Sequence, residues 1–312
     1  MTVRIATRRS ALAKWQANHV SALLVALEPG LDVQLLELMT KGDRILDVPL
    51  AEVGGKGLFV KEIEDALLKG DAQVAVHSMK DLPAVLAPGL TIAAVPVRED
   101  PRDALVSKGK RLDDLPLGAR VGTASLRRAA QLRALRPDLR VETIRGNVQT
   151  RLRKVDEGFD AVVLAHAGLK RLGLVERVVQ VFTTEEMLPA VAQGALAIEA
   201  RESDAETLRR LAPLDDATTR HQVEAERGLL RRLEGGCQVP IAAHAVVEGG
   251  VVQLKALVAS LDGSRIIRGQ RSGPVGQAAR VGVALAEELL LKGAAEILSQ
   301  IERGPGLAAP KR

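Results

Sequence analysis

Short apolar runs alternate with helical stretches through much of this chain. The run at residues 3–7 predicts a strand, and apolar positions spaced by three and four over 11–27 predict the helix that follows. A strand after Pro29-Gly30, a helix over 60–69 and a strand over 73–76 complete the series. This alternation is typical of βαβ units, in which a helix joins two parallel strands.

The same order of strands and helices occurs a second time at a nearly constant offset. Its elements are expected at residues 120–123, 126–135, 149–157 and 162–165, with Pro137-Asp138 opening the strand between the two helices. A repeat of this kind predicts two similar lobes, each with a mostly parallel sheet. Ligands of such sheets bind beyond the carboxyl ends of the strands.

Proline-containing segments at 95–101 and 188–194 predict two crossovers between the lobes, and a strand over 195–199 is expected to return to the first lobe. A helix over 216–232, strands over 241–247, 251–260 and 265–270, and closing helices predict a smaller α+β domain. We therefore expect lobe 1 at 1–96 and 195–212, lobe 2 at 100–188, and a C-terminal domain at 216–312.

Arginines stand at matching strand-to-helix junctions of the two lobes. Helix N-termini carry a partial positive charge, so arginines there indicate a bound anion, although ordinary solvated surface arginines are the alternative. The residues expected to face a shared cleft are Thr7, Arg8 and Ser10 in lobe 1, and Thr123, Ser125, Arg127 and Arg128 in lobe 2. Further cations of lobe 2 at such junctions are Arg145, Arg151, Lys170 and Arg171.

The segment His77 to Asp81 follows an apolar strand, so Ser78, Lys80 and Asp81 are expected at the carboxyl edge of the sheet. Asp81 either forms a plain Asx turn or serves as an ionised carboxylate that stabilises a cation or takes a proton. Residues 51–59 do not fit a phosphate-binding loop, because Gly57 follows Lys56 where Ser or Thr is required. A flap that brings Lys56 over the cleft is the better interpretation.

Composition narrows the class of protein. Hydrophobic residues make up 46% of 312 residues and charged residues 27%, which excludes a disordered chain. The net charge of +5 admits an anionic partner, but three Phe, one Trp and no Tyr argue against stacking on nucleic-acid bases.

The five histidines have no metal-binding spacing. Without a signal-like or membrane-length apolar segment, we expect a cytoplasmic protein.

The single cysteine, Cys237, follows two glycines and precedes Pro240 in a turn. Free cysteines are often buried, so Cys237 could be an inert thiol. The turn around it favours the alternative, a residue displayed for chemistry. One cysteine cannot form an internal disulfide, so nothing points to an oxidising compartment.

Taken together, segments along nearly the whole chain closely resemble the porphobilinogen deaminases, also called hydroxymethylbilane synthases. These segments are residues 4–10, 54–59, 77–83, 122–128, 145–152 and 233–240. The resemblance implies two lobes like those of periplasmic binding proteins and a third domain. It also implies a transferase of haem and other tetrapyrrole biosynthesis, monomeric and cytoplasmic, that joins four porphobilinogen molecules into linear hydroxymethylbilane and releases ammonia.

The resemblance further implies roles for individual residues. Cys237 would carry a dipyrromethane cofactor through a thioether, and Asp81 would be the catalytic carboxylate that stabilises the cation left when ammonia departs. Binding of porphobilinogen, of the growing polypyrrole chain and of the cofactor would fall to Arg8, Ser10, Lys56, Ser78, Lys80, Thr123, Ser125, Arg127, Arg128, Arg145, Arg151, Arg171 and Gln193. No metal, nucleic acid or membrane is expected.

Two other functions are compatible with parts of the pattern. A non-catalytic, two-lobed anion-binding protein would explain the repeated lobes and the arginines, but neither the cysteine turn nor Asp81. A basic nucleic-acid binder would explain the net charge, but not the shortage of aromatic residues or the position of the arginines at helix starts.

Overall fold

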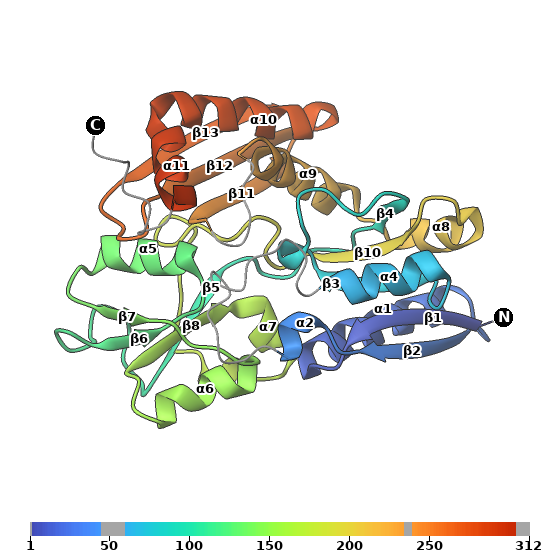
Figure 1. The fold of residues 1–312 in the computed structure, drawn as a ribbon, viewed down its shortest axis with the longest axis horizontal. Helices are drawn as coiled ribbons and strands as arrows, with labels where there is room; N and C mark the ends of the chain where they lie inside the picture. The colour runs from blue at the N-terminus through green and yellow to red at the C-terminus, as the bar shows by residue number, and fades with distance from the viewer. Residues whose placement is uncertain (1, 45–59, 234–238, 304–312) are drawn as a thin grey trace.

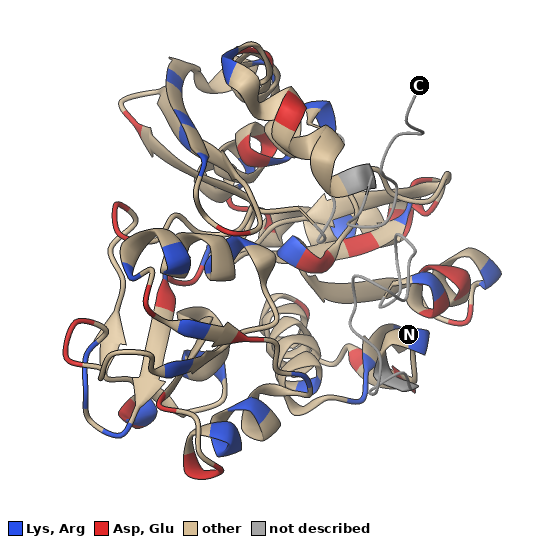
Figure 2. Cartoon of the chain, turned by 60° about the vertical axis from the view of Figure 1, so that its left-hand side comes forward, with Lys and Arg blue, Asp and Glu red and all other residues tan. Residues whose placement is uncertain are grey.

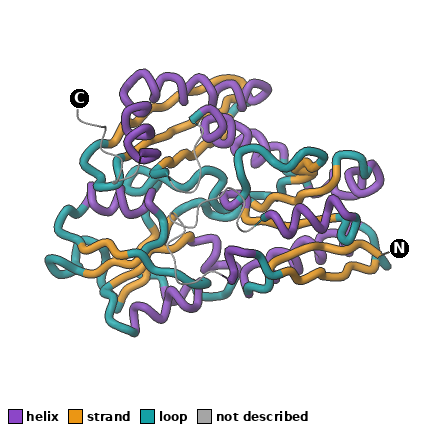
Figure 3. Tube along the Cα trace, in the orientation of Figure 1, coloured by secondary structure: helices purple, strands orange, loops and turns teal. Residues whose placement is uncertain are grey.

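The computed structural model describes residues 2–44, 60–233 and 239–303. These residues form two α/β lobes side by side, with a smaller third domain packed across both (Figure 1). Figure 3 shows that helices cover the sheets of all three parts. Lysine and arginine are interspersed with acidic residues over the whole ribbon (Figure 2).

In the described part of the chain, lobe 1 is built on a five-stranded sheet with the order β2-β1-β3-β10-β4. Its strands are β1 (Thr2–Arg8), β2 (Asp32–Leu38), β3 (Val74–Ser78), β4 (Leu90–Ala94) and β10 (Leu196–Arg201). β1 pairs in parallel with β2 and β3, whereas β10 runs antiparallel to both of its neighbours. The expected return strand is thus inserted inside the first sheet.

The helices of lobe 1 are α1 (Ala11–Leu27), α2 (Lys41–Arg44), α4 (Lys61–Lys69) and α8 (Ala205–Leu211). Helix α1 begins because the Ser10 hydroxyl accepts a hydrogen bond from the amide of Ala13. Its buried side chains, among them Val20 and Leu24, pack with the apolar residues of β1 and β3. Helix α4 ends at Gly70, whose φ of 79° lies in the left-handed region that favours glycine.

Lobe 2 has the same sheet order, β7-β6-β8-β5-β9. Its elements are β5 (Asp103–Ser107), β6 (Arg120–Gly122), α5 (Leu126–Leu135), β7 (Arg140–Glu142), α6 (Val148–Asp156), β8 (Ala161–Ala165), α7 (His166–Arg171) and β9 (Gln180–Val181). Here β5 is the strand that runs against its neighbours. The predicted repeat is confirmed: each sheet is mostly parallel, and each is completed by the antiparallel strand that follows a crossover.

The third domain has an antiparallel sheet of β11 (Ile241–Glu248), β12 (Val251–Ala259) and β13 (Ile266–Pro274). Two helices, α9 (Ala217–Arg232) and α10 (Ala278–Leu289), pack together closely, and α11 (Ala295–Arg303) follows. A Cβ at Gly228 would lie 2.4 Å from the carbonyl oxygen of Ala279, and one at Gly282 would lie 2.0 Å from that of Ala225. Glycine is therefore required at both positions of the helix crossing.

A buried ion pair joins the crossovers to the third domain. Arg98, on the first crossover, donates from Nη1 to Glu226 Oε1 on α9 at 2.7 Å and from Nε to the carbonyl oxygen of Gln193 on the second crossover at 2.8 Å. Glu226 also accepts from the amides of Ala192 and Ala245. Because every partner is buried and hydrogen-bonded, removing either charge would leave the other uncompensated.

Candidate functional site

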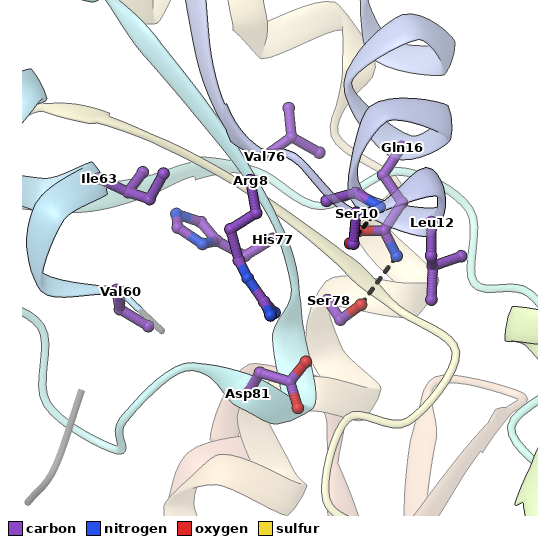
Figure 4. A pocket seen from close by; sticks show the side chains of 11 residues that line it. Arg8, Ser10, Leu12, Gln16, Val60, Ile63, Val76, His77, Ser78 and Asp81 are labelled. Atoms are coloured by element: carbon purple, nitrogen blue, oxygen red, sulfur yellow. Dashed lines mark hydrogen bonds between the residues drawn. The ribbon is translucent and has the colours of Figure 1, made fainter. Parts of the chain in front are cut away.

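A pocket opens at the carboxyl ends of β1 and β3, the edge of an α/β sheet at which ligands bind. β1 supplies Arg8, the start of α1 supplies Ser10 and Gln16, and β3 supplies His77 and Ser78. The Gln16 amide donates to Ser78 Oγ at 2.8 Å and so fixes that hydroxyl. Figure 4 shows the Arg8 guanidinium directed toward the Asp81 carboxylate across this pocket.

Asp81 ends a single turn of 3-10 helix, η1 (Met79–Asp81), which is fixed at both sides. The Met79 side chain is buried and its amide donates to the carbonyl oxygen of Ala195, while Leu82 is buried on the other side. The Asp81 side chain itself is exposed and lines the pocket. Within the described residues its carboxylate forms no hydrogen bond, so the Asx turn considered above is not found there.

Several cations act on the Asp81 carboxylate from both lobes. Burial lowers the pKa of the Lys80 ammonium to about 8, Arg128 adds to this effect, and Asp81 opposes it. Burial and Arg128 likewise lower the pKa of Arg151 to about 10, again against Asp81. The lowered pKa values show that the negative charge near Lys80 and Arg151 does not offset the cost of burying their positive charges. The site is therefore suited to an anionic ligand.

Arg127 and Arg128 lie in a buried network rather than at an open surface. The Asp103 carboxylate on β5 accepts from Arg127 Nη1 at 2.7 Å and from Arg128 Nε at 2.8 Å. Burial alone would raise the pKa of Asp103, but the two guanidinium groups hold it well below its usual range. Arg127 also donates to the carbonyl oxygen of Leu188.

The sequence pattern at Arg127 has an explanation within the protein. Arginine at a helix start does indicate an anion, but for Arg127 the anion is the protein's own Asp103. Arg128 shares that carboxylate and is also within electrostatic reach of Asp81.

Gln193 connects the two lobes. Its side-chain oxygen accepts from Lys80 Nζ at 3.4 Å and from Arg128 Nη2 at 3.3 Å, and its amide nitrogen donates to Asp103. The residue is fully buried on the second crossover. Gln193 thus holds the Lys80 side chain of lobe 1 beside the arginine network of lobe 2.

The remaining predicted residues have mixed positions. Thr7 and Thr123 are buried, and their hydroxyls bond to the Ala13 carbonyl and the Ser125 amide of their own junctions. Arg171 is buried, donates to the carbonyl oxygen of Gly194 and lies over the Trp15 ring. The contacts of these side chains are with the crossovers and helix starts.

Two further predicted side chains of lobe 2 lie within electrostatic reach of each other, and one of them, Arg151, also of Asp81. Arg151 donates from Nε to the carbonyl oxygen of Gly146 on the loop before α6. Arg145 stands on the same loop and acts electrostatically on Arg151. Lys56 and Cys237 lie outside the described residues.

Two functional features were missed at the level of sequence. Gln16 lies on α1 below Ser10 and lines the pocket, and Glu199 on β10 pairs with His77 beneath it. The signal for Glu199 was available: it is a charged residue inside an apolar strand, and such residues are rarely buried without a partner. No local sequence signal distinguished Gln16 from the other polar residues of its helix.

Residues 2–44, 60–233 and 239–303 contain neither a membrane-spanning helix nor a metal-binding cluster. No helix there is long and apolar enough to cross a membrane. The same residues contain no cluster of three or more His, Cys, Asp or Glu side chains that could hold a metal ion.

Comparison with known proteins gives matches over nearly the whole chain. Residues 3–209 match the family described as porphobilinogen deaminase, dipyromethane cofactor binding domain, and residues 221–291 match its C-terminal domain. The porphobilinogen deaminase of Syntrophotalea carbinolica is 54% identical over 310 residues, covering 99% of this chain and 98% of that protein. That of Syntrophobacter fumaroxidans is 55% identical over 303 residues, covering 96% and 98%.

Solved structures with lower similarity include the periplasmic VFT2 domain of BvgS from Bordetella pertussis, at 18% identity and a TM-score of 0.40, covering 68% of this chain and 85% of that one. Another is the periplasmic aliphatic sulphonate binding protein SsuA of Escherichia coli, at 15% identity and a TM-score of 0.37, covering 75% and 70%. The family matches and the full-length relatives, in contrast, extend from the first strand to the third domain. The chain therefore belongs to the porphobilinogen deaminase family.

Proposed function

We propose that the porphobilinogen deaminase reaction of this chain takes place in the pocket formed by Arg8, Ser78 and Asp81. The observation that supports this location is the exposed carboxylate of Asp81, which has no hydrogen bond from the residues that the structure describes and lies among cations from both lobes. When the aminomethyl group of porphobilinogen loses ammonia, a positive charge is left on the pyrrole ring. The fixed carboxylate of Asp81 stabilises that charge as it develops.

The cations around Asp81 bind the acidic side chains of the substrate. Each porphobilinogen carries an acetate and a propionate, and arginine suits such groups because its planar guanidinium can donate two parallel hydrogen bonds. The receivers we propose are Arg8, Ser10, Ser78, Lys80, Arg128, Arg145 and Arg151, with Lys56 from the segment outside the described residues. Arg127, Arg171, Gln193, Thr123 and Ser125 then act by positioning these receivers.

The same site fits the dipyrromethane cofactor of the family. The fit rests on Lys80 and Arg151, cations with lowered pKa values that an acid-bearing group would compensate. When bound, the dipyrromethane supplies the free pyrrole carbon to which the first substrate is joined. We propose Cys237, outside the described residues, as its thioether attachment.

Other features of the protein follow from the same assignment. We propose a cytoplasmic monomer whose ligands are porphobilinogen and the growing chain, with no nucleic acid. The domain limits proposed are 1–96 with 195–212 for lobe 1, 100–188 for lobe 2, and 216–312 for the domain that carries the cofactor.

The mass of the intact protein tests the attachment. Protein made in cells that synthesise porphobilinogen should exceed the mass of its sequence by one dipyrromethane, and Cys237→Ala should abolish the excess. Cys237→Ser is the matched control: it keeps the size of the side chain but lacks the sulfur that a thioether requires, so it should also lack the excess mass. An unmodified wild-type mass would contradict the proposal.

A further inference from the structure

Porphobilinogen carries two carboxylates and one ammonium group, and the cations of the cleft account only for the carboxylates. The ammonium is the group that departs as ammonia. A binding site for it must offer a hydrogen-bond acceptor backed by negative charge. Apart from Asp81, one residue lining the same pocket has this character: His77, whose ring is hydrogen-bonded to the buried Glu199 behind it.

His77 and Glu199 form a buried pair at the wall of the pocket. His77 Nε2 lies 2.9 Å from Glu199 Oε2, and their side chains are 7% and 0% exposed. The two residues stand on the adjacent antiparallel strands β3 and β10, which hold the pair rigidly. A carboxylate only accepts hydrogen bonds, so in this pair Nε2 is the donor and Nδ1 of the neutral ring presents a lone pair.

Nδ1 is the ring nitrogen left for a ligand. Within the described residues it has no hydrogen-bond partner, and His77 lines the pocket together with Arg8 and Asp81. Figure 4 shows the imidazole beside the Arg8 side chain. A buried carboxylate behind an imidazole fixes the tautomer and favours a positive partner at the other nitrogen, the same relationship as in hydrolytic triads.

Charged groups of both signs surround the pair. Glu199 Oε1 is buried without a hydrogen bond among the described residues. Glu64 on α4 is close by: burial raises its pKa, Glu199 raises it further and His77 lowers it. The other charged groups facing His77 are Arg8 from β1 and Asp81 from η1. The Glu199 carboxylate thus stands behind the His77 ring, which lines the pocket.

We propose that His77, held by Glu199, binds the aminomethyl ammonium group of porphobilinogen through Nδ1. This inference rests on the proposed location of the reaction in this pocket. When the carbon–nitrogen bond breaks, its electron pair goes to nitrogen and ammonia leaves with the three protons of the ammonium. The positive charge passes to the pyrrole ring beside Asp81, and His77 neither gains nor loses a proton. Glu199 is a positioning residue, because it acts through His77.

Two ligands separate this role from a structural one. The first is porphobilinogen, measured by its KM, and the second is the same pyrrole with a methyl group in place of the aminomethyl group, measured as a competitive inhibitor. His77→Phe should raise the KM of porphobilinogen by about 10-fold to 100-fold, the value of a hydrogen bond to a charged group. It should leave the inhibition constant of the methyl analogue unchanged.

Glu199→Gln provides the second variant, should His77→Phe fail to fold. It keeps the side-chain shape and removes the charge. It should raise the KM of porphobilinogen by a smaller factor than His77→Phe and leave the inhibition constant of the methyl analogue unchanged. If either variant weakens both ligands equally, or neither, the inference is overturned.

Arg8→Leu separates the inference from the pocket assignment. It removes a carboxylate receiver and should weaken both ligands about equally. If Arg8→Leu changes neither ligand, the proposed location of the reaction fails. If it weakens both while His77→Phe shows no preference, only the role of His77 fails.

Discussion

Lobe 1 and lobe 2 each contain a strand followed by a serine-capped helix, with arginine near the junction. In lobe 1 the arginine is Arg8, which lines the pocket beside Asp81. In lobe 2 Arg127 and Arg128 are buried against Asp103. The two junctions thus share their local structure and differ in the location of the carboxylate: Asp81 is exposed to a ligand, whereas Asp103 is sealed in the interior.

The difference shows that two lobes with the same local structure can have different roles. A buried carboxylate with two guanidinium partners stabilises one arrangement of the chain, since each charge depends on the others. An exposed carboxylate contributes little to stability and remains available for chemistry. Neutralising each carboxylate should therefore have opposite consequences.

The largest effect is expected on catalysis in lobe 1. Asp81→Asn should lower kcat by a factor on the order of 10²–10³, because the amide cannot stabilise a developing cation. Its free energy of unfolding should stay near that of the wild type, since the side chain is exposed. Steady-state rates and urea unfolding measure the two quantities. Near-normal turnover would show that the charge of Asp81 is not required.

In lobe 2 the neutralised carboxylate should cost stability. Asp103→Asn leaves two buried guanidinium groups without their anion, so the free energy of unfolding should fall by about 3–5 kcal/mol. Urea unfolding measures this loss. The matched control is Asp138→Asn in the more exposed Arg136–Asp138 pair, which should change stability little. Equal changes in both variants would contradict the role given to the buried network.

Between the lobes, Lys80 should make substrate affinity depend on pH. Its pKa is lowered to about 8, so the ammonium is charged below that pH and loses its proton as the pH rises through it. One pH unit above the pKa, about one tenth of the Lys80 side chains remain charged, and KM for the acidic substrate should be higher there. Lys80→Arg should remove this rise, because arginine stays protonated.

A surface lysine is the control for the Lys80 experiment. Lys110→Arg changes an exposed side chain and should leave the dependence of KM on pH unchanged. If Lys80→Arg also leaves the profile unchanged, Lys80 does not contact the substrate carboxylates.

The smallest effect is expected at the two helix caps. Ser10 and Ser125 accept hydrogen bonds from the amides of Ala13 and Arg128, so Ser→Ala should cost about 1 kcal/mol in either lobe. Only Ser10 lines the pocket, so only Ser10→Ala should also raise KM. A similar rise in KM for Ser125→Ala would remove this difference between the junctions.

Much of the architecture was predictable from local patterns. The helices over 11–27 and 126–135 were predicted with the bounds that the structure has, because serine caps and apolar spacing mark them. The return strand and the three strands of the last domain were also expected where β10, β11, β12 and β13 are found. Strand β5 was not predicted, because a short buried strand that pairs with distant residues has no periodic signal of its own.

The site was predicted less completely than the fold. Arg8, Ser78 and Asp81 were expected together because they end neighbouring parallel strands, and they do line one pocket. Arg127 was expected there on the same grounds, but its partner Asp103 lies on β5, whose position depends on the crossover.

The sequence by itself determined the repeated βαβ order, the helix caps and the strand ends at which chemistry is found, because these depend on residues close together in the chain. Only the tertiary structure decided which charges meet. Asp103 reaches two arginines, Glu199 reaches His77, and Gln193 joins Lys80 to Arg128 through strands and crossovers far apart in the sequence. The physical reason is that a charge is compensated by whatever group burial brings within a few ångströms, and sequence distance does not limit that choice.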